Sequence, residues 1–171
     1  DKIRIVASGT VETFDTAGIG GPHKAYMPLW MYERETALTK PGKALREFAR
    51  SIEKGQQLDM LHDVKTAGHG VCQDHSHAFI AVARLLGCPA RYVSGYLHME
   101  DTEEQVASHA WAEAYIESLG WVGFDPANDK SPDENYVHVA HGFDYADAAP
   151  VSGIKWGPGN ESLTVSITVE Q

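Results

Sequence analysis

The chain has 171 residues, 43% of them apolar, which is enough for one globular domain with a sizeable core. Fourteen Lys and Arg residues against twenty-four Asp and Glu give a net charge of −10, which disfavours nucleic acid and anionic membrane surfaces as partners. No stretch is long and apolar enough to cross a bilayer, so we expect no membrane partner.

The two cysteines, Cys72 and Cys88, are too few for a disulfide framework. We therefore expect free thiols in a reducing compartment, the cytoplasm. The chain begins at Asp1 rather than at an initiator Met, so we also expect residues upstream of it. The sequence indicates no oligomeric state.

The first third of the chain predicts one strand, one loop and two helices. Residues 2–12 alternate between apolar and polar side chains, as in a half-buried strand. The glycines and prolines of residues 15–28 predict a long loop. A helix-start signal at residues 39–41 precedes an apolar helical face over residues 44–52, and a second short helix follows over residues 58–64.

The stretch from Gly70 to Ile80 delivers a cysteine to the start of a helix. From Ala78 onward the apolar residues recur at the spacing of a helix face, and Gly87 ends the helix. Cys72 therefore lies at the positive end of a helix dipole, which lowers the pKa of a thiol from about 8.5. Asp74 lies in the first turn, where it either caps the helix or lines the site.

The second half of the chain predicts strands. Residues 91–97 and 121–124 are rich in aromatic and branched side chains, and residues 163–169 alternate as a final strand. Residues 100–105 predict an acidic, solvated loop. In residues 108–116 a period of two separates alanines on one face from a polar and aromatic face that carries His109, Trp111, Glu113 and Tyr115.

Cysteine catalysis needs a nucleophile, a base within hydrogen-bonding reach and a group that orients the base. Cys72 at the helix start, His109 on its strand and Asp125 at the end of the next strand are candidates for these roles. Purely structural interpretations stay open: an inert buried thiol, an ordinary strand histidine and an aspartate that starts a turn before Pro126. Cys88 is expected to pack in the core.

Cys72, His75 and His77 also suggest a metal site. However, His75 and His77 lie about 200° apart around a helix, and only three candidate ligands cluster. We therefore expect neither a metal nor another cofactor, and we expect one of these histidines to pack beneath the cleft.

Four ordered stretches make these interpretations more specific: Gly-Val-Cys-Gln-Asp-His, Leu-Gly-Cys-Pro-Ala-Arg-Tyr-Val-Ser-Gly-Tyr, His-Ala-Trp-Ala-Glu-Ala-Tyr and Gly-Trp-Val-Gly-Phe-Asp-Pro-Ala-Asn. Together they closely resemble the transglutaminase-like superfamily, in particular its bacterial transglutaminase-like cysteine protease branch. The resemblance implies an α+β, papain-like (transglutaminase-core) fold, with the nucleophile helix packed on an antiparallel β-sheet. It places the family's triad on Cys72, His109 and Asp125.

The resemblance also implies a domain organisation. Residues 1–37 would be the end of a β-rich N-terminal domain or a linker, cut short in this sequence, and residues 38–171 the catalytic domain. One departure stands out: the family carries a longer passage before the cysteine loop, where this chain has only Lys65, Thr66 and Ala67.

The remaining site residues are secondary candidates. We expect the backbone N–H of Cys72 to stabilise an oxyanion, with Gln73 or the upstream Trp30 as second donor. Trp111 would be core or cleft wall, and Glu113 would be a structural partner for an arginine such as Arg91.

We therefore expect acyl transfer on peptide or protein amides through a thioester, most simply hydrolysis by a cysteine protease-like enzyme. Transamidation of protein glutamine by the same triad is the alternative within this chemistry. A non-catalytic module that binds a peptide or partner is the alternative outside it.

Overall fold

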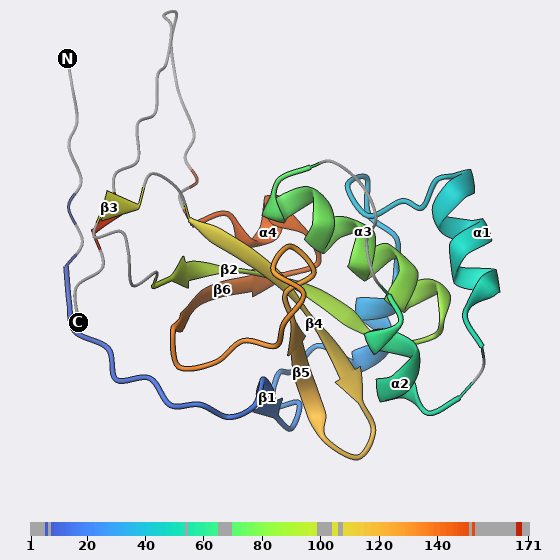
Figure 1. Ribbon diagram of the computed structural model, residues 1–171, viewed down its shortest axis with the longest axis horizontal. Coiled ribbons are helices and arrows are strands. Elements are labelled where there is room, and N and C mark those ends of the chain that lie inside the picture. The colour runs from blue at the N-terminus through green and yellow to red at the C-terminus, as the bar shows by residue number, and fades with distance from the viewer. Residues whose placement is uncertain are drawn as a thin grey trace, which may run out of the picture.

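A computed structural model describes residues 6, 8–53, 55–64, 70–98, 104–105, 108–150, 152 and 167–168. Its centre is an antiparallel five-stranded sheet with strand order β1-β5-β4-β2-β6 (Figure 1). The strands are β1 (Ile19–Gly21), β2 (Ala90–Leu97), β4 (His109–Ile116), β5 (Gly120–Phe124) and β6 (Tyr136–Gly142). The helices are η1 (Leu29–Glu33), α1 (Lys43–Ser51), α2 (Gln57–His62), α3 (Cys72–Leu85) and α4 (Tyr145–Ala148). The α+β prediction is confirmed.

Helix α3 packs on the inner face of the sheet, above all on β4. Ala110, Ala112 and Ala114 project toward the helix, and their small side chains let it approach the sheet closely. Phe79 on α3 stacks on Phe124 of β5, with ring centroids 4.9 Å apart. Helices α1 and α2 lie beside the later turns of α3, and α4 lies near its start (Figure 1).

Both ends of α3 are fixed by local sequence. At the start, Asp74 Oδ2 accepts a hydrogen bond from the Val71 N–H at 3.1 Å, so this carboxylate caps the helix. At the end, Gly87 adopts φ +79° and the Cys88 N–H bonds to the Ala83 carbonyl at 2.9 Å, a Schellman motif. The predicted boundaries of this helix are therefore confirmed.

The outer face of the sheet carries the aromatic and charged residues of β4 that alternate with its alanines. Arg91 Nε donates to Glu113 Oε2 at 2.6 Å, and both residues are buried. The Arg91 guanidinium also lies 4.1 Å over the ring of Trp121. Trp111 is buried on the same face against Tyr136. The period-two pattern of β4 thus separates an alanine face from an aromatic and ionic one, as predicted.

Segments before α1 belong to the same folded unit. Strand β1 pairs with β5, and Arg84 of α3 donates to the carbonyls of Arg34, Ala90 and Phe143, each at 2.8 Å, and to the Thr39 hydroxyl at 2.7 Å. These bonds attach residues 19–39 to the sheet and to α3. The β-rich domain expected ahead of the catalytic domain stays a prediction.

Three expectations about secondary structure were wrong where the structure describes them. The expected loop over residues 15–28 contains strand β1, which pairs with β5. Residues 6 and 8–12 form no strand, because no other described strand pairs with them and Val11 is 63% exposed. Within the expected acidic loop, β3 (Glu104–Gln105) instead pairs with β7 (Ile167–Thr168). The short passage at residues 65–67 lies outside the described residues. So do the remaining parts of the two strands expected over residues 2–12 and 163–169. None of the described helices has the length and apolarity needed to cross a bilayer.

Candidate active site

His109 and Asp125 are hydrogen-bonded at one end of the sheet. His109 begins β4, Asp125 follows the last residue of β5, and His109 Nε2 lies 2.6 Å from Asp125 Oδ2. Antiparallel pairing of the two strands, with Ala112 opposite Phe124, brings the start of one beside the end of the other. This bond orients the imidazole and leaves Nδ1 as the ring nitrogen available to another group.

A second layer of donors holds Asp125. Its Oδ2 also accepts hydrogen bonds from the Tyr136 hydroxyl and from Asn128 Nδ2, both at 2.7 Å. Its Oδ1 accepts from the backbone N–H groups of Ala127 at 3.0 Å and Asn128 at 3.2 Å. Burial raises the pKa of Asp125, but the bonds to His109 and Tyr136 outweigh it, so the pKa of this carboxyl lies below its usual value. Asp125 is thus a fixed carboxylate.

Cys72 lies on the other side of the imidazole, at the first residue of α3. Burial raises the pKa of the Cys72 thiol, but the hydrogen bond with the His109 side chain, the charge of His109 and the backbone N–H groups of Ala110 and Gln73 together lower it. Burial likewise lowers the pKa of His109, but its bonds to Asp125 and Cys72 and their charges raise it to about 9. These contacts shift the pKa values of Cys72 and His109 in the directions that lead to a thiolate beside an imidazolium.

The other candidate residues take different positions. The N–H of Gln73 is directed at the Cys72 thiol, and Asp74 caps α3. Trp111 is only 2% exposed and lies nearly parallel to His109, with ring centroids 6.2 Å apart, so it packs behind the imidazole. Trp30 on η1 is 59% exposed, and no ring contact or hydrogen bond between described residues joins it to Cys72 or His109.

Of the two candidate histidines on α3, His77 is the one that the structure places in the interior. His77 is buried, packs at a tilt against the ring of Tyr92 with centroids 4.9 Å apart, and accepts a hydrogen bond from the Tyr145 N–H at 3.2 Å. His77 therefore links α3 to the start of α4. Among the residues that the structure describes, no group of three or more His, Cys, Asp or Glu side chains is arranged to hold a metal ion.

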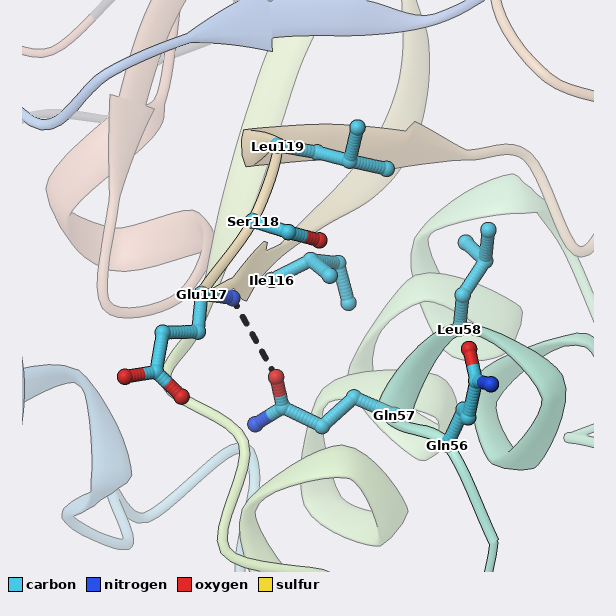
Figure 2. Close-up of a pocket in the computed structure, with 7 residues that line it drawn as sticks. All are labelled: Gln56, Gln57, Leu58, Ile116, Glu117, Ser118 and Leu119. Carbon is cyan, nitrogen blue, oxygen red and sulfur yellow. Dashed lines mark hydrogen bonds between the residues drawn. The ribbon is translucent and has the colours of Figure 1, made fainter.

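Of two pockets in the structure, one borders Asp125 and the other is remote from the candidate triad. One of about 290 Å³ has Asp125 in its wall, together with Phe79, Phe124 and residues from the end of α2. A larger one, of about 410 Å³, lies between the start of α2 and the β4–β5 turn, where the Glu117 N–H donates to Gln57 Oε1 at 3.2 Å (Figure 2). Ile116 in the larger pocket is seven residues along β4 from His109, about 23 Å at strand spacing, so that pocket is remote from the thiol.

A family model matches the part of the chain that carries these residues. The model of the transglutaminase-like superfamily matches residues 37–126, more than half of the chain. The chain belongs to the transglutaminase-like superfamily. The matched region contains Cys72, His109 and Asp125. It also contains helix α3 and strands β2, β4 and β5, which position these residues.

Several curated relatives are similar over part of their length. An uncharacterized protein of Mycobacterium leprae is 41% identical over 117 residues, which cover 66% of this chain and 40% of that protein. An uncharacterized protein of Mycobacterium tuberculosis is 35% identical over 120 residues, or 64% of this chain and 38% of its own. A protein-glutamine gamma-glutamyltransferase of Pseudomonas aeruginosa is 30% identical over 109 residues, which are 57% of this chain and 16% of that protein.

The chain thus spans about two fifths of the length of the mycobacterial relatives it matches. Among solved structures, one described as "a Putative Cysteine Protease from Cytophaga hutchinsonii" superposes with a TM-score of 0.55 and 22% sequence identity. The superposition covers 84% of this chain and 56% of that chain, and it shows a shared fold.

Sequence reasoning missed part of the support for this site. Tyr136 and Asn128 both bond Asp125, and the Ala110 N–H reaches the thiol. Asn128 stands three residues after Asp125, the spacing at which an Asx-type turn returns to its carboxylate, so a signal was available. Tyr136 and Ala110 gave no signal, because strand pairing and helix packing bring them to the site.

Proposed function

We propose that this chain catalyses acyl transfer from amide substrates, with Cys72 as nucleophile, His109 as general acid and base, and Asp125 as the group that orients His109. The proposal rests on one observation: His109 bonds Asp125 through one ring nitrogen and faces Cys72 with the other, while the pKa of the thiol is lowered and that of the imidazole is raised to about 9. A thiolate and an imidazolium are the reactive pair that cysteine catalysis needs.

In the acylation step, the Cys72 thiolate attacks the amide carbonyl carbon and a carbon–sulfur bond forms. The proton held on His109 Nδ1 passes to the amide nitrogen as the carbon–nitrogen bond breaks, so an amine leaves and a thioester remains. Asp125 keeps the imidazole oriented and stabilises its positive charge. Backbone N–H groups at the start of α3, on Cys72 and Gln73, are the donors that we propose for the oxyanion.

In the second step, neutral His109 takes a proton from water or from an amine, which attacks the thioester and releases the acyl group. Water gives hydrolysis of a peptide or protein amide, which is the reaction we propose as primary. The identity with the Pseudomonas aeruginosa protein-glutamine gamma-glutamyltransferase supports transamidation as a second candidate, since both outcomes use the same thioester. None of these steps needs a cofactor.

The experiment is acylation by p-nitrophenyl acetate, with a stopped-flow burst and intact-protein mass as readouts. We expect a burst of one p-nitrophenolate per chain and an acetyl group on Cys72. The Cys72→Ser variant should show neither, and Cys88→Ser is the matched control that should keep both. A native protein that gains no acetyl group at Cys72 would contradict the proposal and favour a binding module with the same fold.

A further inference from the structure

The pocket of about 290 Å³ beside Asp125 has no role in the steps above. Its floor is made by Leu61, Val64, Phe79 and Phe124, each less than 7% exposed. Its rim is made by side chains from the end of α2 and the loop after β5: His62, Pro126, Asp129, Lys130 and Ser131. The pocket is therefore an apolar depression with a polar mouth, of a size that holds one aromatic or branched side chain.

The pocket borders one member of the candidate triad. Asp125 forms part of its wall and bonds His109. Phe79 follows Cys72 by seven residues, so it lies on the same face of α3, two turns or about 10 Å along the axis. A group seated over Phe79 can thus be joined by a short chain to an atom reacting at Cys72.

The charged groups at the pocket are already engaged. Asp125 is held by His109, Asn128 and Tyr136, as described above. Lys130 Nζ lies 3.2 Å from Asp133 Oδ2 and 5.0 Å from the centre of the Tyr136 ring. The exposed His62 ring packs edge-on against Phe124, with centroids 5.5 Å apart. These contacts leave the apolar floor as the main source of binding free energy.

The chemistry of the reaction indicates which part of a substrate would lie there. His109 gives its proton to the leaving amine and takes one from the incoming nucleophile, so both must approach within hydrogen-bonding reach of the imidazole. The acyl group is held instead by the thiol and the oxyanion donors at the start of α3. The pocket borders the His109–Asp125 pair through Asp125 and none of the oxyanion donors, so we assign it to the amine rather than to the acyl group.

From this placement we propose that the pocket is a subsite for the amine part of the reaction, and that it selects amines, leaving or incoming, that carry an apolar body. This inference rests on the proposed acyl transfer. It predicts that apolar amines compete with water for the thioester better than polar amines do.

The test partitions one acyl-enzyme between water and amines. Protein acetylated by p-nitrophenyl acetate is offered phenethylamine or 2-methoxyethylamine at equal concentration, and the ratio of amide to acetate is measured by mass spectrometry. Both products come from the same acyl-enzyme, so the ratio does not depend on the acylation rate. We expect the ratio for phenethylamine to be about tenfold higher, the scale for burying part of an aromatic group.

Two variants make the test specific. In His62→Trp, a larger ring at the mouth should reduce the tenfold preference to about twofold. In Val64→Ala, a larger floor should shift the preference toward 2-naphthylethylamine. Asp59→Trp is the matched control: it places the same ring at an exposed position of α2 that does not line the pocket, and the preference should stay tenfold.

The outcomes separate the two claims. Failure to form an acyl-enzyme at Cys72 would overturn the proposed function and the subsite with it. An acyl-enzyme that partitions equally to both amines, or whose preference is unchanged in both pocket variants, would overturn the subsite and leave the proposed function in place.

Discussion

The two cysteines lie at opposite ends of α3 and show how surroundings decide the chemistry of one side chain. Cys72 begins the helix, and its pKa is lowered because the contacts with His109 and two backbone N–H groups outweigh its burial. Cys88 follows the helix and is completely buried, and burial raises the pKa of its thiol despite a hydrogen bond with Gln57. The two thiols differ in pKa because Cys72 contacts the His109 imidazolium, whereas no such cation among the described residues contacts Cys88.

The largest effect should come from removing the negative charge of Asp125, which stabilises the His109 imidazolium. In Asp125→Asn the carboxylate is lost while the shape is kept, so the imidazole loses its orientation and its raised pKa. We expect amidase or esterase turnover to fall about 10³- to 10⁴-fold. Steady-state kinetics on an ester substrate, with circular dichroism to confirm folding, checks this. A loss of less than tenfold would mean that Asp125 does not orient the base.

The rate of acylation at alkaline pH should show that Cys72, unlike Cys88, is paired with an imidazolium. Because the pKa of His109 is raised to about 9, the imidazolium persists well above the usual value of about 6.5. Acylation by an amide needs that proton for the leaving amine, so its rate should fall about tenfold per unit as pH rises above 9. A rate of amide hydrolysis that already falls between pH 6 and 7 would show that the pair does not raise the pKa of His109.

At the far end of α3, Arg84 should affect stability rather than chemistry. Its guanidinium is buried and bonds three backbone carbonyls and Thr39, so Arg84→Met leaves buried acceptors without donors. We expect a loss of about 3 kcal/mol in the free energy of unfolding, measured by urea denaturation. Still-folded protein should keep its Cys72 acylation burst. An unchanged midpoint would mean that other donors or water replace the guanidinium.

The smallest effect should come from Cys88 itself. Cys88→Ala removes one buried sulfur atom, so we expect a loss of about 1 kcal/mol in the free energy of unfolding and no change in turnover. Thermal denaturation and ester kinetics, side by side with native protein, provide the measurement. A tenfold loss of turnover would place Cys88 in the chemistry and remove the contrast between the two thiols.

The sequence predicted the parts of the molecule that local chemistry determines. The capped start of α3, its end at Gly87 and the two faces of β4 follow from glycine placement, apolar spacing and period-two alternation. Strand β6 was not predicted, because a shift in register opposite Ser94 and Gly95 interrupts the alternation of a histidine-rich stretch. Tyr136, which that strand brings to Asp125, could therefore not be assigned to the site.

Predictions of strands were less accurate where the strand needs a partner that is distant in the sequence. Residues 6 and 8–12 have the alternation of a strand but pair with none of the strands that the structure describes. Residues 104–105 have acidic loop character but pair with residues near the end of the chain. Local patterns show what a segment is able to form, whereas pairing depends on which other segment reaches it.

The rate of alkylation of Cys72 by iodoacetamide between pH 4 and 10 tests the central claim most directly, in native protein and in His109→Ala, with Cys88 as internal control. Native Cys72 should react well below pH 8, Cys88 should stay unreactive, and His109→Ala should return Cys72 to the behaviour of an ordinary thiol with a pKa near 8.5. Native Cys72 that reacts only near pH 8.5, with the same profile in His109→Ala, would contradict the thiolate–imidazolium pair on which the proposed function rests.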